Sequence, residues 1–289
     1  MDFTWQDLVN YLSAPAGAIP QEIPGIYLLS EEDNCLIEKL RCGSEVSAQV
    51  FIAEDVRTNT PAVYLLNDDT RLVFYVDTED VLRHSRYDTD EEEWQGEGEG
   101  EGDVIIPRTS KLSGCFTSGG QMVFFQNQSG LLQGVRIQGS ACELLSPISA
   151  EPSEATPHFV IRSADENLYL FYIGRDRYIH YLIEGPEPGE WHDNVLRSPV
   201  LDQVVVNFMV IPDKDMNFEA YLLTTDMLVG IDKYAELMDF GKVRGGKFTA
   251  SSGKECIIES IKLIKEGVKL ISGKVSEAKK KRKDNKANP

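Results

Sequence analysis

The sequence lacks any apolar run long enough to cross a bilayer. A membrane-spanning helix needs roughly 18 consecutive apolar residues, and no stretch reaches that length although 42% of the residues are hydrophobic. The opening segment, Met1–Asp7, contains neither a basic leader nor an apolar core and does not resemble a secretory signal. We therefore expect a cytoplasmic protein with a core of ordinary hydrophobicity.

Cysteine is scarce, and its spacing excludes the usual redox and zinc motifs. The chain has 5 cysteines and no CxxC pair, which suits a reducing compartment rather than a disulfide framework. The 4 histidines have no metal-ligand spacing among themselves; they are His84, His158, His180 and His192. No metal or other cofactor is predicted.

Familiar catalytic motifs are absent as well. The sequence contains no HExxH, Walker A or Gly-x-Ser-x-Gly pattern, and no GxGxxG followed by a helix. Hydrolysis or hydride transfer by one of these known sites therefore has no support in the sequence.

Basic residues are few relative to acidic ones. Lysine and arginine total 29 against 47 aspartates and glutamates, giving a net charge of −18. An acidic body repels phosphate backbones instead of gaining free energy from released counterions. We expect no nucleic acid at the folded body.

What the chain does contain is a repeated β-hairpin. In the clearest copy, residues 71–76 and 80–87 mix β-branched and aromatic residues on either side of a short polar turn. Similar pairs recur, and subtracting the start positions of their second strands gives spacings of 45, 50, 47 and 50. These start positions are Cys35, Asp80, Gly130, Arg177 and Met227. A repeat of short strands at this period is typical of a β-propeller.

A further strand precedes most of the hairpins. The first hairpin has no clear preceding strand, but residues 246–251 follow the last hairpin at the expected interval. We expect this C-terminal strand to close the ring beside the first blade, because an open ring leaves two strand edges unpaired. The prediction is an all-β propeller over residues 23–253, with five blades or, as the alternative, six.

The segments outside the ring are predicted to be helical. Within residues 1–22, apolar residues up to Leu12 share one face of a short helix, which we expect to cover an opening or an edge of the ring. Residues 254–289 read as an amphipathic helix followed by a basic tail. This segment can dock on the propeller, contact a partner protein, lie on an anionic membrane surface or act as a nuclear localisation signal.

An acidic, glycine-rich segment at residues 88–103 follows the second hairpin. Its spacing does not fit an EF-hand loop, and alternating glycine and glutamate resists packing, so we expect a solvated loop. Trp94 in this segment and Trp191 each follow the second strand of a hairpin by about ten residues. Such equivalent tryptophans are interpreted either as blade-packing residues or as rings that stack on a ligand.

Polar and aromatic residues also recur at equivalent positions of the second strands. Alternation along a strand puts neighbouring residues on opposite sheet faces, and packed blades favour apolar residues on a buried face. His84 and Tyr181 are therefore candidates for a pocket lining, or else residues that face solvent. The same holds for the row that precedes them, which includes Arg83, Gln133 and His180.

At these repeats the chain resembles the fungal fucose-specific lectins, which are propellers with a per-blade pattern of Arg-Val-Tyr-Tyr, a short loop, Ile-x-Glu and then Trp. In that family the Arg and Glu bind sugar hydroxyls and the Trp or Tyr stacks on the sugar. Here the Arg place is filled by Ile26, Leu72, Met122, Tyr169 and Tyr221. The Glu place is filled by Lys39, His84, Gly134, Tyr181 and Ile231, and only the tryptophans, Trp94 and Trp191, are retained.

The resemblance implies a lectin-like scaffold with more apolar and aromatic pockets. Some fungal proteins with such propellers act in secondary metabolism as cofactor-free pericyclic catalysts of the hetero-Diels–Alderase type. By that resemblance, an apolar pocket aligns a polyketide and a terpenoid while His84, Tyr181 or His180 polarises an oxygen. Arg83, Trp94, Gln133, Tyr169 and Trp191 are the predicted ligand contacts.

Two alternatives to the cyclase hypothesis remain open. One is a carbohydrate-binding lectin with altered sugar specificity. The other is a non-catalytic interaction propeller that uses its C-terminal helix. The sequence predicts a small-molecule ligand, either a terpenoid or polyketide or a sugar, for the first two.

Overall fold

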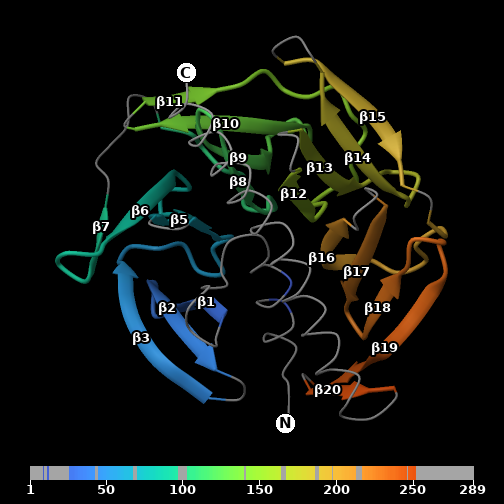
Figure 1. Cartoon of the computed structure of the whole chain (residues 1–289), viewed down its shortest axis with the longest axis horizontal. Coiled ribbons are helices and arrows are strands. Elements are labelled where there is room, and N and C mark those ends of the chain that lie inside the picture. Colours follow the sequence, from blue (N-terminus) through green and yellow to red (C-terminus); the bar gives the residue numbers. More distant parts are fainter. Residues whose placement is uncertain are drawn as a thin grey trace, which may run out of the picture.

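The chain folds into a ring of five β-blades (Figure 1). The computed structural model describes Val9, Leu12 and residues 26–42, 45–67, 70–96, 103–139, 141–163, 167–185, 189–196, 198–212, 217–245 and 247–251. Within these residues every sheet consists of strands that are consecutive in sequence and antiparallel. The predicted all-β propeller and its five blades are confirmed.

The first three blades are formed by β1 to β11. Blade 1 contains β1 (Ile26–Glu32), β2 (Cys35–Cys42) and β3 (Glu45–Ala53). Blade 2 contains β4 (Val63–Asn67), β5 (Thr70–Val76), β6 (Leu82–Asp88) and β7 (Glu93–Gly96). Blade 3 contains β8 (Ser113–Thr117), β9 (Gly120–Gln126), β10 (Leu132–Gln138) and β11 (Ala141–Leu144).

The last two blades follow the same plan. Blade 4 contains β12 (His158–Arg162), β13 (Leu168–Ile173), β14 (Ile179–Glu184) and β15 (Trp191–Val195). Blade 5 contains β16 (Val205–Pro212), β17 (Phe218–Thr224), β18 (Met227–Ile231), β19 (Leu237–Arg244) and β20 (Lys247–Ala250).

The hairpin turns fix how the repeats align. Asn34, Asp80, Gly130 and Arg177 all have a left-handed backbone, with φ of 62°, 66°, 77° and 67°. Asn, Asp and Gly tolerate this conformation best, which explains their choice at such turns. Asn34, and not Cys35, is therefore the counterpart of Asp80, so the predicted alignment of the first repeat is shifted by one residue.

The predicted C-terminal strand forms, but its place differs from the prediction. As β20 it pairs with β19 in blade 5, with Lys242 opposite Thr249, and so lies at the outer edge of that blade. No described strand is shared between blade 5 and blade 1. Blade 1 keeps three strands, in agreement with the absence of a clear strand before the first hairpin.

The core lies between the blades. Apolar side chains of one blade pack against those of the next, as where Val63, Phe74 and Val76 of blade 2 meet Val123 and Phe125 of blade 3. Blades 3 and 4 share a similar cluster around Phe124, Leu170 and Tyr172. Burying each such side chain contributes about 1.5–3 kcal/mol, so the inter-blade surfaces provide the stability of the ring.

Two predicted segments can be compared only in part. The acidic segment is not all loop, because Glu93–Gly96 forms β7 and Trp94 on it is buried. Val9 and Leu12 have helical backbone, and Leu12 is buried in the core. The predicted helix and tail at residues 254–289 lie outside the described residues.

His158 links blades 3 and 4 through a buried hydrogen-bond chain. The Ser113 hydroxyl donates to its Nδ1 (2.6 Å), and its Nε2–H donates to the Lys111 carbonyl (3.0 Å). This arrangement uses the neutral ring, and burial lowers the pKa of His158 to about 4 from 6.5.

The depressed pKa of His158 predicts acid sensitivity. Between pH 6.5 and 4 the unfolded chain binds a proton that the folded chain does not, so the free energy of unfolding should fall by about 3 kcal/mol as pH decreases through this window. Urea unfolding at several pH values measures this. His158→Gln should have a lower free energy of unfolding than wild type at pH 7, but this free energy should fall less on acidification. If the free energy of unfolding depends on pH equally in both proteins, the prediction is contradicted.

Candidate ligand site between blades 1 and 2

A buried ion pair joins the first two blades. Arg71 on β5 places Nη2 against both carboxylate oxygens of Glu38 on β2, and its Nε–H donates to the Tyr64 hydroxyl at 2.8 Å. The Tyr64 hydroxyl in turn donates to Glu38 Oε2 at 3.2 Å. The three side chains form a closed network in which the guanidinium is held in one orientation.

Aromatic rings surround the guanidinium. Arg71 Cζ lies 3.7 Å from the ring centroid of Tyr87, 4.7 Å from that of Tyr27 and 5.3 Å from that of Trp94. Tyr64 stacks on Tyr27 with centroids 5.4 Å apart, and its ring meets the edge of Trp94. A cation over several rings is stabilised by their quadrupoles, most strongly where water is excluded.

The electrostatics of the pair reflect its burial. The Glu38 side chain is 3% exposed, and this burial raises the pKa of its carboxyl even though the charge of Arg71 opposes the shift. The Arg71 side chain is 17% exposed. Its Nη1 makes no hydrogen bond to the described residues, so its two N–H donors are not used within the cluster.

The equivalent positions in other blades have different residues. Four residues after the left-handed turn residue, on the strand face turned toward the next blade, stand Glu38, His84, Gly134 and Tyr181. The true occupant of the Glu place in blade 1 is therefore Glu38 and not Lys39. Tyr27 likewise replaces Ile26 at the Arg place of that blade, because Tyr27 and Leu72 occupy the same register in their hairpins.

Between blades 3 and 4 the equivalent space is filled by apolar groups. Trp191 meets the Phe124 ring edge-on, with centroids 5.8 Å apart. Opposite it stands Gly134, where a Cβ atom would come within 3.1 Å of Phe124 and 3.3 Å of Leu145. Trp191 is therefore a packing residue of this interface, although it occupies the same strand position as Trp94.

The other two candidate positions also lie in aromatic packing. His84 stacks on Phe74 with centroids 5.4 Å apart. Tyr181 lies 5.8 Å from Phe171 and 5.6 Å from Phe218 of blade 5, and Tyr169 joins the same cluster. The structure thus brings Tyr169 and Tyr181 together but places His84 in a different interface.

His180 points to the other face of β14. Its Nδ1 lies 3.2 Å from Asp193 Oδ1, and its Nε2 lies 3.1 Å from both carboxylate oxygens of Asp176. The Tyr172 hydroxyl donates to Asp193 at 2.7 Å. This cluster ties β14 to β15 and to the preceding turn, away from Tyr181.

Arg83 and Gln133 are engaged in local structure. Arg83 Nε donates to Asp77 Oδ2 at 2.6 Å, which braces the β5–β6 turn. Gln133 donates to the Leu145 carbonyl at 2.7 Å and accepts from Asn127 at 3.1 Å. Both side chains stabilise the connections of their own blades.

Of the predicted ligand contacts, only Trp94 lies beside the Arg71 guanidinium. The sequence prediction omits Arg71, Tyr27, Tyr64 and Tyr87 because they come from different strands of two blades. Glu38 lies one residue before the predicted position, and aligning the repeats on the turn residue Asn34 would have identified it.

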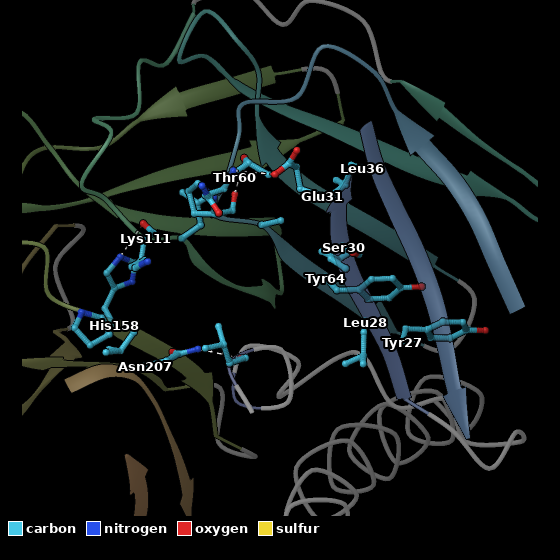
Figure 2. Close-up of a pocket in the computed structure, with 18 residues that line it drawn as sticks. Tyr27, Leu28, Ser30, Glu31, Leu36, Thr60, Tyr64, Lys111, His158 and Asn207 are labelled. Atoms are coloured by element: carbon cyan, nitrogen blue, oxygen red, sulfur yellow. Dashed lines mark hydrogen bonds between the residues drawn. The ribbon is translucent and has the colours of Figure 1, made fainter. Parts of the chain in front are cut away.

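A central cavity of about 490 Å³ lies where the inner strands meet. Figure 2 shows Tyr27 and Tyr64 along one side of it and His158 on the other. Its lining contains none of His84, His180 and Tyr181.

Two further classes of site were sought in the described part of the chain. It contains no group of three or more His, Cys, Asp or Glu side chains suited to a metal ion. It also contains no helix that is long and apolar enough to cross a membrane.

The buried ion pair is the strongest indication of function in the ring. Removing two charges from water costs several kcal/mol per ion, and apolar residues of similar volume often serve stability as well or better. The interface between blades 3 and 4 shows that this scaffold packs without the pair. We therefore take the Arg71 cluster, defined as Tyr27, Glu38, Tyr64, Arg71, Tyr87 and Trp94, as the candidate ligand site.

Comparison with solved structures identifies lectin propellers of similar fold. AofleA from Arthrobotrys oligospora matches with a TM-score of 0.61 and 14% identity, covering 84% of this chain and 75% of that chain. The SapL1 lectin in complex with alpha methyl fucoside has a TM-score of 0.56 and 14% identity, over 84% of this chain and 85% of that chain.

The lectin of Aleuria aurantia is a third neighbour. This six-bladed fucose-recognising propeller has a TM-score of 0.54 and 14% identity, over 76% of this chain and 73% of that chain. No protein-family profile matches the sequence. No curated protein sequence matches it at a significant level. The chain therefore has a lectin-like propeller fold, and identity at this level shows the fold alone.

Proposed function

We propose that this protein binds a neutral saccharide at one site per chain, the Arg71 cluster between blades 1 and 2. The observation that carries the proposal is a guanidinium fixed by Glu38 and Tyr64 through Nε and Nη2, with Nη1 not used in these bonds and aromatic rings beside it. Sugar sites in proteins combine such fixed polar donors with an aromatic surface.

Each part of the cluster has a role in this proposal. Arg71 Nη1 donates to a hydroxyl or ring oxygen of the sugar, and the half-buried rings of Tyr27 and Tyr87 offer apolar surface to its C–H face. Glu38 is too deeply buried to reach the ligand and instead holds the guanidinium in place. Trp94 supports both Tyr87, at 5.5 Å between centroids, and Tyr64.

The solved neighbours support the choice of ligand class. SapL1 is bound to alpha methyl fucoside, and the Aleuria aurantia lectin has been solved with the same sugar. In this chain Arg71 does not occupy the Arg place of the family pattern, because Leu72 stands there in blade 2. Arg71 precedes Leu72 on β5 and lies on the opposite face of the strand, where it contacts Glu38 of blade 1. We therefore expect an altered sugar preference rather than the same fucose site.

The cyclase hypothesis receives no comparable support. It depends on a donor such as His84, Tyr181 or His180 next to an apolar pocket, and these residues lie in three separate environments that do not line the central cavity. Sugar binding is the function that the geometry favours.

Calorimetric titration with methyl glycosides of fucose, mannose, galactose and glucose tests the proposal. We expect at least one sugar to bind with a stoichiometry of one per chain. Arg71→Lys retains a positive charge near Glu38 but lacks the planar fork and its free donors, so its affinity should fall by about tenfold or more, which is the 1.4 kcal/mol of one good hydrogen bond to a charged group.

Arg136→Lys is the matched control, because Arg136 forms an exposed pair with Glu143 on blade 3. Its affinity should equal that of the wild type. Absence of binding to every sugar, or equal loss in both variants, would contradict the proposal.

A further inference from the structure

The outermost strand of blade 1 differs from those of the other blades. β3 spans nine residues, Glu45–Ala53, whereas β7 and β11 have four each and β15 has five. In blade 5 the eight-residue β19 is covered by β20. Among the described residues no strand pairs with the outer edge of β3. Figure 1 shows β3 as the long outer strand of its blade.

The composition of β3 provides little protection for this edge. Natural edge strands are usually short or carry lysine, proline or inward charges that prevent pairing with another chain. β3 has the sequence EVSAQVFIA, with its single charge at Glu45, and it exposes Val46 (52%) and Phe51 (54%). Register shifts bend it near both ends, but Ala48–Phe51 pairs regularly with β2.

The strand is also complementary to itself. In an antiparallel pair of two copies centred on Gln49, Ala48 faces Val50 of the other copy within the segment that pairs regularly with β2, and the exposed Val46 and Phe51 lie on either side of this contact. Glu45 faces Ala53, so no like charges meet. Such a pairing is symmetric about a twofold axis and closes after two chains.

We propose that the outer edge of β3 pairs with the same edge of a second copy, forming a twofold dimer by strand addition. One strand pair buries less surface than a standard interface of about 1,200–2,000 Å², so the dimer is weak, with a dissociation constant on the order of 10 µM. Where the proposed sugar binding also holds, the dimer carries two sites and converts a monovalent chain into a divalent one.

Sedimentation velocity of the full chain tests the dimer without any sugar. Wild type should shift from monomer to dimer between about 1 and about 200 µM, the range that brackets the expected constant. Val46→Lys combined with Phe51→Lys should remain monomeric throughout, because lysines on an edge strand oppose its pairing with another chain. The residues are exposed, so circular dichroism should show an intact fold.

Two further proteins make the result specific. Val195→Lys changes a residue of matched 54% exposure on β15 and should dimerise like wild type. The Val46→Glu and Phe51→Glu double variant should be monomeric alone but form a mixed dimer with the lysine variant. A monomeric wild type, a monomeric Val195→Lys, or failure of the mixed dimer would overturn the proposal.

Discussion

Arg71→Met should lower the free energy of unfolding by about 3–5 kcal/mol, the cost of leaving one partner of a buried pair uncompensated. The substitution removes the cation and its hydrogen bonds to Glu38 and Tyr64, while the carboxylate stays where only 3% of it reaches solvent. Urea unfolding at pH 7 measures the loss.

The pH dependence identifies the cause. Without Arg71 the pKa of Glu38 rises further above 4.5, its ordinary value, because burial is the largest influence on it and the opposing charge and hydrogen bonds of Arg71 are lost, although Tyr64 still donates to the carboxylate. The folded variant then holds a proton that the unfolded chain releases, so its stability decreases as pH rises above about 4.5. The deficit relative to wild type should therefore shrink in acid.

The double variant Arg71→Met with Glu38→Leu is the control. It removes both charges, so it should be more stable than Arg71→Met alone. If the single variant is as stable as wild type, or if adding Glu38→Leu gives no recovery, the ion pair is not the element that holds these two blades in register.

Trp94→Leu should reduce sugar affinity by up to about tenfold, whereas Trp191→Leu should leave it unchanged. A contact between aromatic rings contributes about 0.5–1.5 kcal/mol, and about 1.4 kcal/mol corresponds to tenfold in affinity. Both tryptophans occupy the same strand position and both pack on neighbouring rings. Only Trp94 contacts the guanidinium and Tyr87.

The two variants serve as controls for each other. Each replaces a buried or half-buried ring, so both should lose stability by about 3 kcal/mol, at the low end of the range for large core residues. Calorimetric titration at a temperature where both are folded separates binding from stability. Equal loss of affinity in the two variants would show that the effect comes from the fold and not from the site.

The sequence predicts the ring well because a blade is local. Alternating β-branched and aromatic residues around turns with Asn34, Asp80 and Gly130 determine hairpins from neighbouring residues alone. The position of β20 is not predictable in this way. From the sequence, β20 can pair with blade 5 or with blade 1. The short connection between β19 and β20 favours pairing with β19 of blade 5.

The site is harder to predict than the fold, because its members belong to two blades. Aligning the first repeat one residue too late assigns Lys39, which lies on the opposite face of β2, to the position that Glu38 occupies. Arg71 is the second residue of β5, and the residue after it, Leu72, occupies the Arg place of the family pattern. Its contact with Glu38 follows only from the way blade 2 packs against blade 1, which no repeat pattern contains.

The arrangement of every blade from consecutive strands has a consequence for folding. Nearly all strand pairing joins neighbours in sequence, so the contact order within the sheets is low and each blade can form as its own segment is synthesised. At the seam between blades 5 and 1 the described residues include no exchanged strand, and residues of both blades, such as Leu28 and Tyr221, belong to one apolar cluster. Opening of the native ring should therefore begin at this seam, as a local fluctuation that leaves the five sheets intact.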